Sequence, residues 1–238
     1  MAKIHGKNAA IYVAGYDLSG RLNEATIDIG IDLADALAFQ EAAKTYVEGQ
    51  HNWSAAIRGL FDPAQYNIDE VLHGLIGSAA DIITILPEGD AALKKGYGGT
   101  GELSARGIRV PSTSIVEVSA SITGHGKIAR VTRIDKQDVT ANGNGTGVDM
   151  GAAGTEIIGI LHVYALKAAC AITVEFEQSS DNGATDAYAS VGWSFGSMSA
   201  IGAKRYLVSG AVEQWLRAKW TLTGTAPTAS FIVLAMTR

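Results

Sequence analysis

Hydrophobic and polar residues alternate along several short segments of this chain, which is the pattern of a half-buried β-strand. The clearest segment covers residues 26–33. It has an apolar face and an acidic face, formed by Ile27, Ile29, Ile31 and Leu33 and by Asp28, Gly30 and Asp32, respectively. A second alternating segment covers 53–61 and ends before Pro63, because proline cannot donate to a sheet ladder. The segment 34–50 between them is compatible with a short helix that ends at Gly49.

One segment has the periodicity of a helix. Asn67 suits the N-cap, and Gly77 suits the position just after the last turn. Apolar residues between them recur at helical spacing and form a single stripe, which comprises Ile68, Val71, Leu72, Leu75 and Ile76. We therefore expect one helix over 67–77 that packs on a sheet, with His73 off the stripe and exposed.

Strands are expected on both sides of a glycine-rich segment, 141–150, that has the composition of a flexible linker. The strands before it are predicted at 9–13, 82–86, 106–110, 115–123 and 127–134, with a long irregular loop over 87–105. Those after it are predicted at 156–166, 171–178, 188–195, 204–209, 212–222 and 229–236. Short strands at this spacing, with no helix among them, indicate an all-β sandwich. The predicted fold is mainly β, with domains at 1–140 and 151–238.

The composition narrows the class of function. The chain has 238 residues, of which 47% are hydrophobic, so it can bury a core. Its formal net charge is −5, and it lacks the Lys and Arg clusters of a nucleic-acid-binding surface. Its one cysteine, Cys170, excludes an intrachain disulfide, and its apolar stretches are too short to span a bilayer. We expect a soluble protein made in a reducing cytoplasm, without a membrane partner.

No residue pattern predicts a catalytic site, a cofactor or a metal. Residues 96–101 match the dinucleotide fingerprint GxGxxG, but no buried strand leads into them and no helical pattern follows. The histidines are scattered and not at metal-ligand spacing. Three tryptophans of the C-terminal half, Trp193, Trp215 and Trp220, are expected in a sandwich core, with stacking on a sugar as the alternative.

A dispersed set of residues between 8 and 135 carries a resemblance to a known family. The set comprises Asp17-Leu-Ser-Gly20, Leu22, Asp28, Asp32, Phe39, Lys44-Thr-Tyr46, Gly49, Ser54, Gly59, Phe61-Asp62, Ile76-Gly77-Ser78, the strand Val116 to Ile122, Gly124-His-Gly126 and Arg130. This pattern resembles the tail tube (major tail) proteins of long-tailed bacteriophages with non-contractile tails. The C-terminal half, through Ser179-Ser-Asp-Asn-Gly183, Trp215-Leu-Arg217 and Thr223-Gly-Thr225, is similar to a β-sandwich appended to some of these proteins.

The resemblance implies a fold and an assembly. The N-terminal domain would be a two-sheet, barrel-forming sandwich with one flanking helix. Six copies would form a ring whose inner sheets join into one β-barrel around a central channel, the lumen. Rings would stack into a tube around a tape-measure protein, bounded by tail-tip and terminator proteins, and DNA would pass through the lumen as transient cargo. The protein would be assembled in the bacterial cytoplasm and reside in the virion tail.

The acidic strand face and two loops are the candidate sites. A lumen that lets DNA slide should repel phosphates, so we expect Asp28 and Asp32 to face it. The alternative is that these carboxylates face bulk solvent. Contacts between rings are expected from two loops, through Leu37, Phe39, Tyr46 and Val47 and through Lys94, Lys95 and Tyr97. The alternative functions are a carbohydrate-binding or adhesion module in the C-terminal half and a capsid decoration protein.

Overall fold

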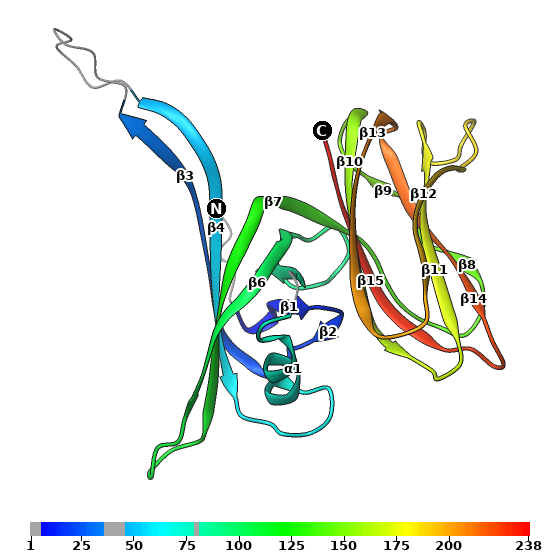
Figure 1. Ribbon diagram of the computed structural model, residues 1–238. Coiled ribbons are helices and arrows are strands. Elements are labelled where there is room, and N and C mark those ends of the chain that lie inside the picture. The colour runs from blue at the N-terminus through cyan, green and yellow to red at the C-terminus, as the bar shows by residue number, and fades with distance from the viewer. Residues whose placement is uncertain (1–5, 36–45, 79–80) are drawn as a thin grey trace, which may run out of the picture. The chain divides into compact units, whose positions relative to one another are not determined.

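The computed structural model describes residues 6–35, 46–78 and 81–238 (Figure 1). This part of the chain is mainly β, with two antiparallel sheets and one α-helix, so the predicted fold class is confirmed. The chain divides into two compact units. Unit 1 comprises 1–20, 82–98 and 129–238, and unit 2 comprises 21–81 and 99–128.

Unit 2 is a sheet with the strand order β3, β4, β7 and β6, and a single helix. Its elements are β3 (Leu22–Asp35), β4 (Tyr46–Leu60), α1 (Ile68–Leu75), β6 (Lys95–Arg109) and β7 (Glu117–Val139); β6 and β7 also contribute residues to unit 1. Asp28 lies opposite Ser54, which lies opposite Thr123, so the alternation of each strand continues across the sheet.

The helix forms where its sequence signals predict it. Asn67 at its start is extended, and Gly77 just beyond its end has φ +73°, a backbone conformation that a side chain would strain. Of the predicted stripe, Ile68, Val71 and Leu72 are buried; Ile76 at the helix end is exposed. An ion pair between Asp69 and Arg106 ties the helix to β6. His73 is exposed, as expected.

Three local expectations were wrong. The two strands expected at 115–123 and 127–134 are one continuous strand, β7, over Glu117–Val139. Within the predicted helix 34–50, the described residues extend β3 and β4, and Asp35 pairs with Tyr46. The predicted loop 87–105 is a strand from Lys95 onward. Its glycines, which suggested a loop, instead make room for a large side chain, because a Cβ at Gly99 or Gly101 would lie only 2.9 Å or 3.0 Å from the Trp53 indole.

Unit 1 contains the two sheets of a β-sandwich. The first, ten-stranded sheet has the order β13-β10-β15-β7-β6-β5-β1-β2 and also includes β3 and β4 of unit 2; the second, five-stranded sheet has β12-β11-β14-β8, with β9 also paired to β14. The bounds are β1 (Ala10–Val13), β2 (Tyr16–Asp17), β5 (Asp81–Leu86), β8 (Gly143–Asn144), β9 (Val148–Asp149), β10 (Gly154–Leu166), β11 (Ala171–Ser179), β12 (Ala189–Met198), β13 (Gly202–Val212), β14 (Trp215–Thr223) and β15 (Ala229–Thr237); a 3-10 turn, Gly6–Asn8, precedes them.

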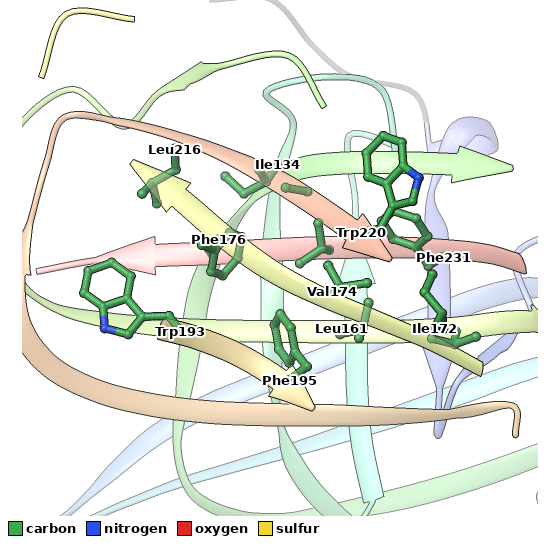
Figure 2. Packing of buried hydrophobic residues seen from close by; sticks show 14 of the residues in the cluster. Ile134, Leu161, Ile172, Val174, Phe176, Trp193, Phe195, Leu216, Trp220 and Phe231 are labelled. Carbon is green, nitrogen blue, oxygen red and sulfur yellow. The ribbon is translucent and has the colours of Figure 1, made fainter. Parts of the chain in front are cut away.

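The sandwich core consists of aromatic and branched side chains from both sheets (Figure 2). Phe176, Phe195 and Tyr206 form an aromatic cluster, and Trp220 packs on Phe231 with ring centroids 5.6 Å apart. β10 and β15 are buried on both faces, so their sequences are continuous apolar runs rather than alternating ones.

The expected linker 141–150 carries two short strands, β8 and β9, that pair with β14. Residues 129–238 belong to one compact unit, to which the end of β7 contributes by pairing with β15. The division of the chain at 141–150 stays a prediction.

A buried histidine lies in β10 of unit 1. His162 Nδ1 accepts a hydrogen bond of 3.3 Å from the Gly15 backbone N–H, and Nε2 lies 2.8 Å from the Thr84 hydroxyl. Because Nδ1 accepts a bond, the neutral ring carries its proton on Nε2 and donates it to Thr84. Burial lowers the pKa of His162 to about 3, so the ring is neutral at physiological pH.

Candidate assembly surface

The two faces of the unit 2 sheet differ sharply in chemistry. On one face Trp53, Ala55, Ile57 and Ile122 are buried in the unit's core. The opposite face, here called the polar face, consists of exposed or half-exposed residues, namely Glu24, Thr26, Asp28, Gly30, Asp32, Asn52, Ser54, Ala56, Arg58, Ser119, Ser121 and Thr123. The only cation in this set, Arg58, lies 3.8 Å from the Glu24 carboxylate. The polar face therefore carries hydroxyls, amides and carboxylates, with its positive charge paired.

Asp28 and Asp32 both belong to this polar face. Asp28 is exposed and lines a shallow hollow with Asn52, Ser54 and Thr123. Asp32 accepts a 2.7 Å hydrogen bond from the Asn52 amide, which places the two side chains on one side of the sheet. The predicted grouping of the two carboxylates is thus a feature of the structure, and their facing a lumen stays a prediction.

The apolar face of β3 is uncovered beyond Trp53. Trp53 itself is 4% exposed, whereas Ile29, Ile31 and Leu33, here called the apolar stripe, are 54%, 42% and 62% exposed. The neighbouring Tyr46 and Val47 are exposed as well. A run of large apolar side chains in water marks a contact surface rather than a core. Sequence reasoning assigned these isoleucines to a half-buried strand and missed their exposure.

The predicted inter-ring residues that the structure describes are divided between the two units. Tyr46 and Val47 lie in unit 2 at the start of β4, and Leu37 and Phe39 lie outside the described residues. Lys94, Lys95 and Tyr97 belong to unit 1. Lys94 pairs with Glu88 at 3.3 Å, Lys95 is exposed, and Tyr97 is half-buried in β6. Their role in contacts between rings stays a prediction.

A second exposed apolar group lies at the opposite end of the same sheet. β4 runs from the hairpin end at Tyr46 to Leu60, which pairs with Glu117 at the start of β7. The connection between β6 and β7 therefore lies at the far end, and it exposes Ile108, Val110 and Ile115. The sequence analysis did not single out these residues, although three β-branched side chains around a proline would have been a usable signal.

One outer strand of the unit 2 sheet, β3, has an open side, and the other, β6, is paired with β5 over part of its length. Among the described strands, β3 pairs with β4 alone, over a length of 14 residues that includes no proline. On the other side β6 pairs with β5, which has 6 residues against the 15 of β6, so β5 covers only part of that edge. Unpaired N–H and C=O groups along a long, proline-free edge are a template for pairing with another chain.

The described residues show no metal-ligating cluster of three or more His, Cys, Asp or Glu side chains. The GxGxxG match lies within β6 and not in a turn from a strand to a helix, so it lacks the geometry that holds a pyrophosphate. In the part of the chain that the structure describes, no helix is long and apolar enough to cross a membrane.

Comparisons with known proteins found structural likeness alone. No protein-family model and no curated protein matches the chain. Two gene transfer agent chains, one from a native virion and one from the tail of an empty particle with C6 symmetry, share 11% and 15% identity at TM-scores of 0.43 and 0.42. Each alignment covers 54% of this chain and 98% of the other.

The Dit protein of phage SPP1, described as a hub of the adsorption apparatus in phages that infect Gram-positive bacteria, aligns over nearly both full lengths. The alignment covers 96% of this chain and 99% of Dit, at 9% identity and a TM-score of 0.37. At such identities and TM-scores the likeness by itself assigns no function.

Proposed function

We propose that this chain is a structural subunit of a bacteriophage tail that self-assembles into rings and, by stacking of rings, into a tail tube. The observation that carries the proposal is the unit 2 sheet, which has an open edge at β3, a partly open edge at β6 and one polar face with its cation paired. The sequence resemblance to tail tube proteins supports it. The protein acts without catalysis, and it resides in the virion after assembly in the bacterial cytoplasm.

Ring closure follows from the free parts of these two edges. If β3 of one copy pairs with the part of β6 that β5 leaves free in the next copy, each copy contributes the same set of strands to a continuous sheet, and closing that sheet removes the unpaired edges. With six copies, the number that the resemblance implies, the barrel would have about 24 strands, more than the 16–18 that already leave an aqueous channel in porins. The sheet of unit 2 is therefore sufficient to line a wide channel.

The polar face suits the inner wall of such a channel. Asp28, Asp32 and Glu24 repel phosphates, and Arg58 is held by Glu24. Hydroxyl and amide side chains between them keep the wall wetted without fixed cations that would retain DNA. The opposite face is buried in the core of unit 2 and could not serve this purpose.

The apolar stripe suits a contact between stacked rings. It lies towards one end of the unit 2 sheet, and the exposed Ile108, Val110 and Ile115 lie at the other end. Stacking would remove both groups from water. Tape-measure, tail-tip and terminator proteins are the further partners that this role implies.

Negative-stain electron microscopy of the purified protein over a range of concentrations tests the proposal. Wild-type protein should form rings and hollow tubes. A variant with Ile29→Ser and Leu33→Ser should form rings but far fewer tubes. Leu207→Ser is the matched control, because Leu207 is 54% exposed, as is Ile29, but lies in unit 1. Wild-type protein that remains monomeric at every concentration, by microscopy and by sedimentation, would refute self-assembly.

A further inference from the structure

The sandwich of unit 1 has two strands that lie at the edges of its sheets. Among the described strands, β12 pairs with β11 alone, and β13 pairs with β10 alone. Unpaired backbone groups along an edge are a template for pairing with another chain. Several backbone groups of β12, however, are bonded to side chains of the same unit.

Side chains of β13 donate hydrogen bonds to three alternate carbonyls of β12. Lys204 Nζ lies 2.8 Å from the Phe195 carbonyl oxygen and 3.1 Å from that of Ser197. The Tyr206 hydroxyl donates to the Trp193 carbonyl at 3.3 Å. The Tyr206 ring is fixed against Phe195, with centroids 4.6 Å apart. Lys204 is half-exposed, so its ammonium bonds these carbonyls without being removed from water.

Two N–H groups of β12 are bonded within the strand itself. The Gly192 N–H donates to Ser190 Oγ at 3.4 Å, and the Gly196 N–H donates to Ser194 Oγ at 3.0 Å. Both glycines have positive φ, +76° and +69°, and the register with β11 shifts on both sides of Glu175. The strand is therefore bulged, and bulges twist an edge away from an approaching strand.

The opposite edge of the same sheet is protected in a different way. There β14 pairs with β8 and β9, which have two residues each, and strands this short offer little ladder to another chain. Of the three tryptophans expected in the core, Trp193 and Trp220 are buried there, whereas Trp215 is half-buried and pairs with Asp149 of β9. The longer edge, β12, depends instead on side chains.

We propose that Lys204 protects β12 from pairing with the β12 strand of a second copy of this chain. Two identical edges can pair antiparallel about a two-fold axis, which makes a second copy the partner that fits. A strand that approached β12 would have to displace the ammonium from the Phe195 and Ser197 carbonyls and bury it. Burying an unpaired charge is costly, so the lysine opposes the contact.

This protection has a consequence for assembly that rests on the proposed function. The edge strand of unit 2, β3, contains no lysine, arginine or proline over its 14 residues. Strand pairing between copies is therefore opposed at the sandwich and unopposed at β3. The distinction directs association to the unit 2 sheet and away from contacts between sandwiches, which would compete with ring closure.

Sedimentation velocity of the full chain tests the proposal with two substitutions at one position. Lys204→Val removes the charge and both bonds and favours a strand, so it should begin to associate at a concentration lower than the wild type by about tenfold or more. Lys204→Glu removes the same bonds but keeps a charge that a second β12 would have to bury, so it should sediment as the wild type does. Hydrogen exchange should show that β12 amides gain protection as Lys204→Val associates.

Lys167→Val is the matched control in the same unit. Lys167 Nζ also donates to two backbone carbonyls, those of Thr225 at 3.2 Å and Ala226 at 2.9 Å, but these lie in the connection between β14 and β15 and not in a strand. The variant loses an ammonium and two bonds without uncovering an edge, so it should sediment as the wild type does. Urea unfolding of each variant measures its stability separately.

Three results would overturn the proposal. The first is sedimentation of a folded Lys204→Val that matches the wild type, and the second is protection gained away from β12. The third is equal association of Lys204→Val and Lys204→Glu, because loss of the bonds and not of the charge would then be the cause. If Lys204→Val does not fold, Lys204→Gln removes the charge at similar size and decides the matter in the same way.

The outcomes for this inference and for the tail role are distinguishable. Association of Lys204→Val through β12, in a chain whose wild type never forms rings, would uphold the protection of β12 while the tail role failed. Wild-type tubes together with a folded Lys204→Val that behaves as the wild type would do the reverse.

Discussion

Substituting Gly124 by alanine should destabilise unit 2 through one buried side chain. A Cβ at Gly124 would overlap three atoms of the Trp53 indole. The indole has no room to retreat, because Gly99 and Gly101 approach it from β6, where an added Cβ would lie 2.9 Å and 3.0 Å from its ring. Relief therefore requires movement of the backbone. Overpacking of this kind costs about 1–3 kcal/mol, and we expect the upper part of that range because the obstructing atoms are rigid.

The matched control is the same substitution in the helix of the same unit. A Cβ at Gly74 meets nothing within 4 Å, and alanine favours a helix over glycine by about 1 kcal/mol. The two variants should thus move the free energy of unfolding in opposite directions. In urea the midpoint for Gly124→Ala should fall by about 1 M, given slopes of 1–3 kcal/mol/M.

Hydrogen exchange identifies which unit is affected. Amides of β4 and β7 around Trp53 should lose protection in Gly124→Ala, whereas those of β10 and β15 in unit 1 should not. Trp53 comes just before the residues of β4 that pair with β7. Looser packing of Trp53 should therefore also loosen the β3–β4 hairpin that carries the apolar stripe. An unchanged urea midpoint together with unchanged protection of β4 would show that the indole is not confined by these glycines.

Three further changes have defined outcomes. The pKa of His162 is lowered from 6.5 to about 3, so between these pH values the unfolded chain binds a proton that the folded chain does not. The free energy of unfolding should therefore fall by up to about 1.4 kcal/mol per pH unit as pH drops below 6.5. His162→Gln should flatten this pH dependence in urea titrations. The double variant Asp28→Lys and Asp32→Lys should leave the melting temperature almost unchanged but impair DNA ejection from particles. The control variant, Asp28→Asn and Asp32→Asn, should eject DNA normally. Normal ejection from the lysine variant would show that this face is not the lumen. Arg106→Ala should lower the unfolding free energy by about 1–3 kcal/mol, since it leaves the partly buried Asp69 carboxylate unpaired, and Asp69→Asn combined with it should recover part of the loss.

The alternating pattern was sufficient to predict most strands and the one helix. Strand alternation placed Asp28 and Asp32 on one face, and the structure confirms that they share it. Helical spacing with Asn67 and Gly77 predicted α1 almost to the residue. These features depend on periods of two and of 3.6 residues, which a sequence displays directly.

The glycine-rich segments were misread because the reason for a glycine at a given position can be a side chain far away in the sequence. The residues 96–101 looked like a loop, since glycine is frequent in loops, but Gly99 and Gly101 lie in β6 against Trp53, 46 and 48 positions earlier in the chain by residue number. The segment 141–150 looked like a linker, yet its short strands pair with β14, more than 60 positions later. A single sequence does not reveal which distant side chain a glycine accommodates.

The sequence by itself determined the mainly β class, the single helix and the amphipathic strand at 26–33. Only the tertiary structure decided which apolar residues are covered. Ile57 and Ile29 occur in equivalent alternating patterns, but Ile57 is 2% exposed and Ile29 is 54% exposed. The physical reason is that alternation records which face of a strand is apolar, whereas burial depends on whether another element packs on that face. The candidate contact surface follows from that second, three-dimensional condition.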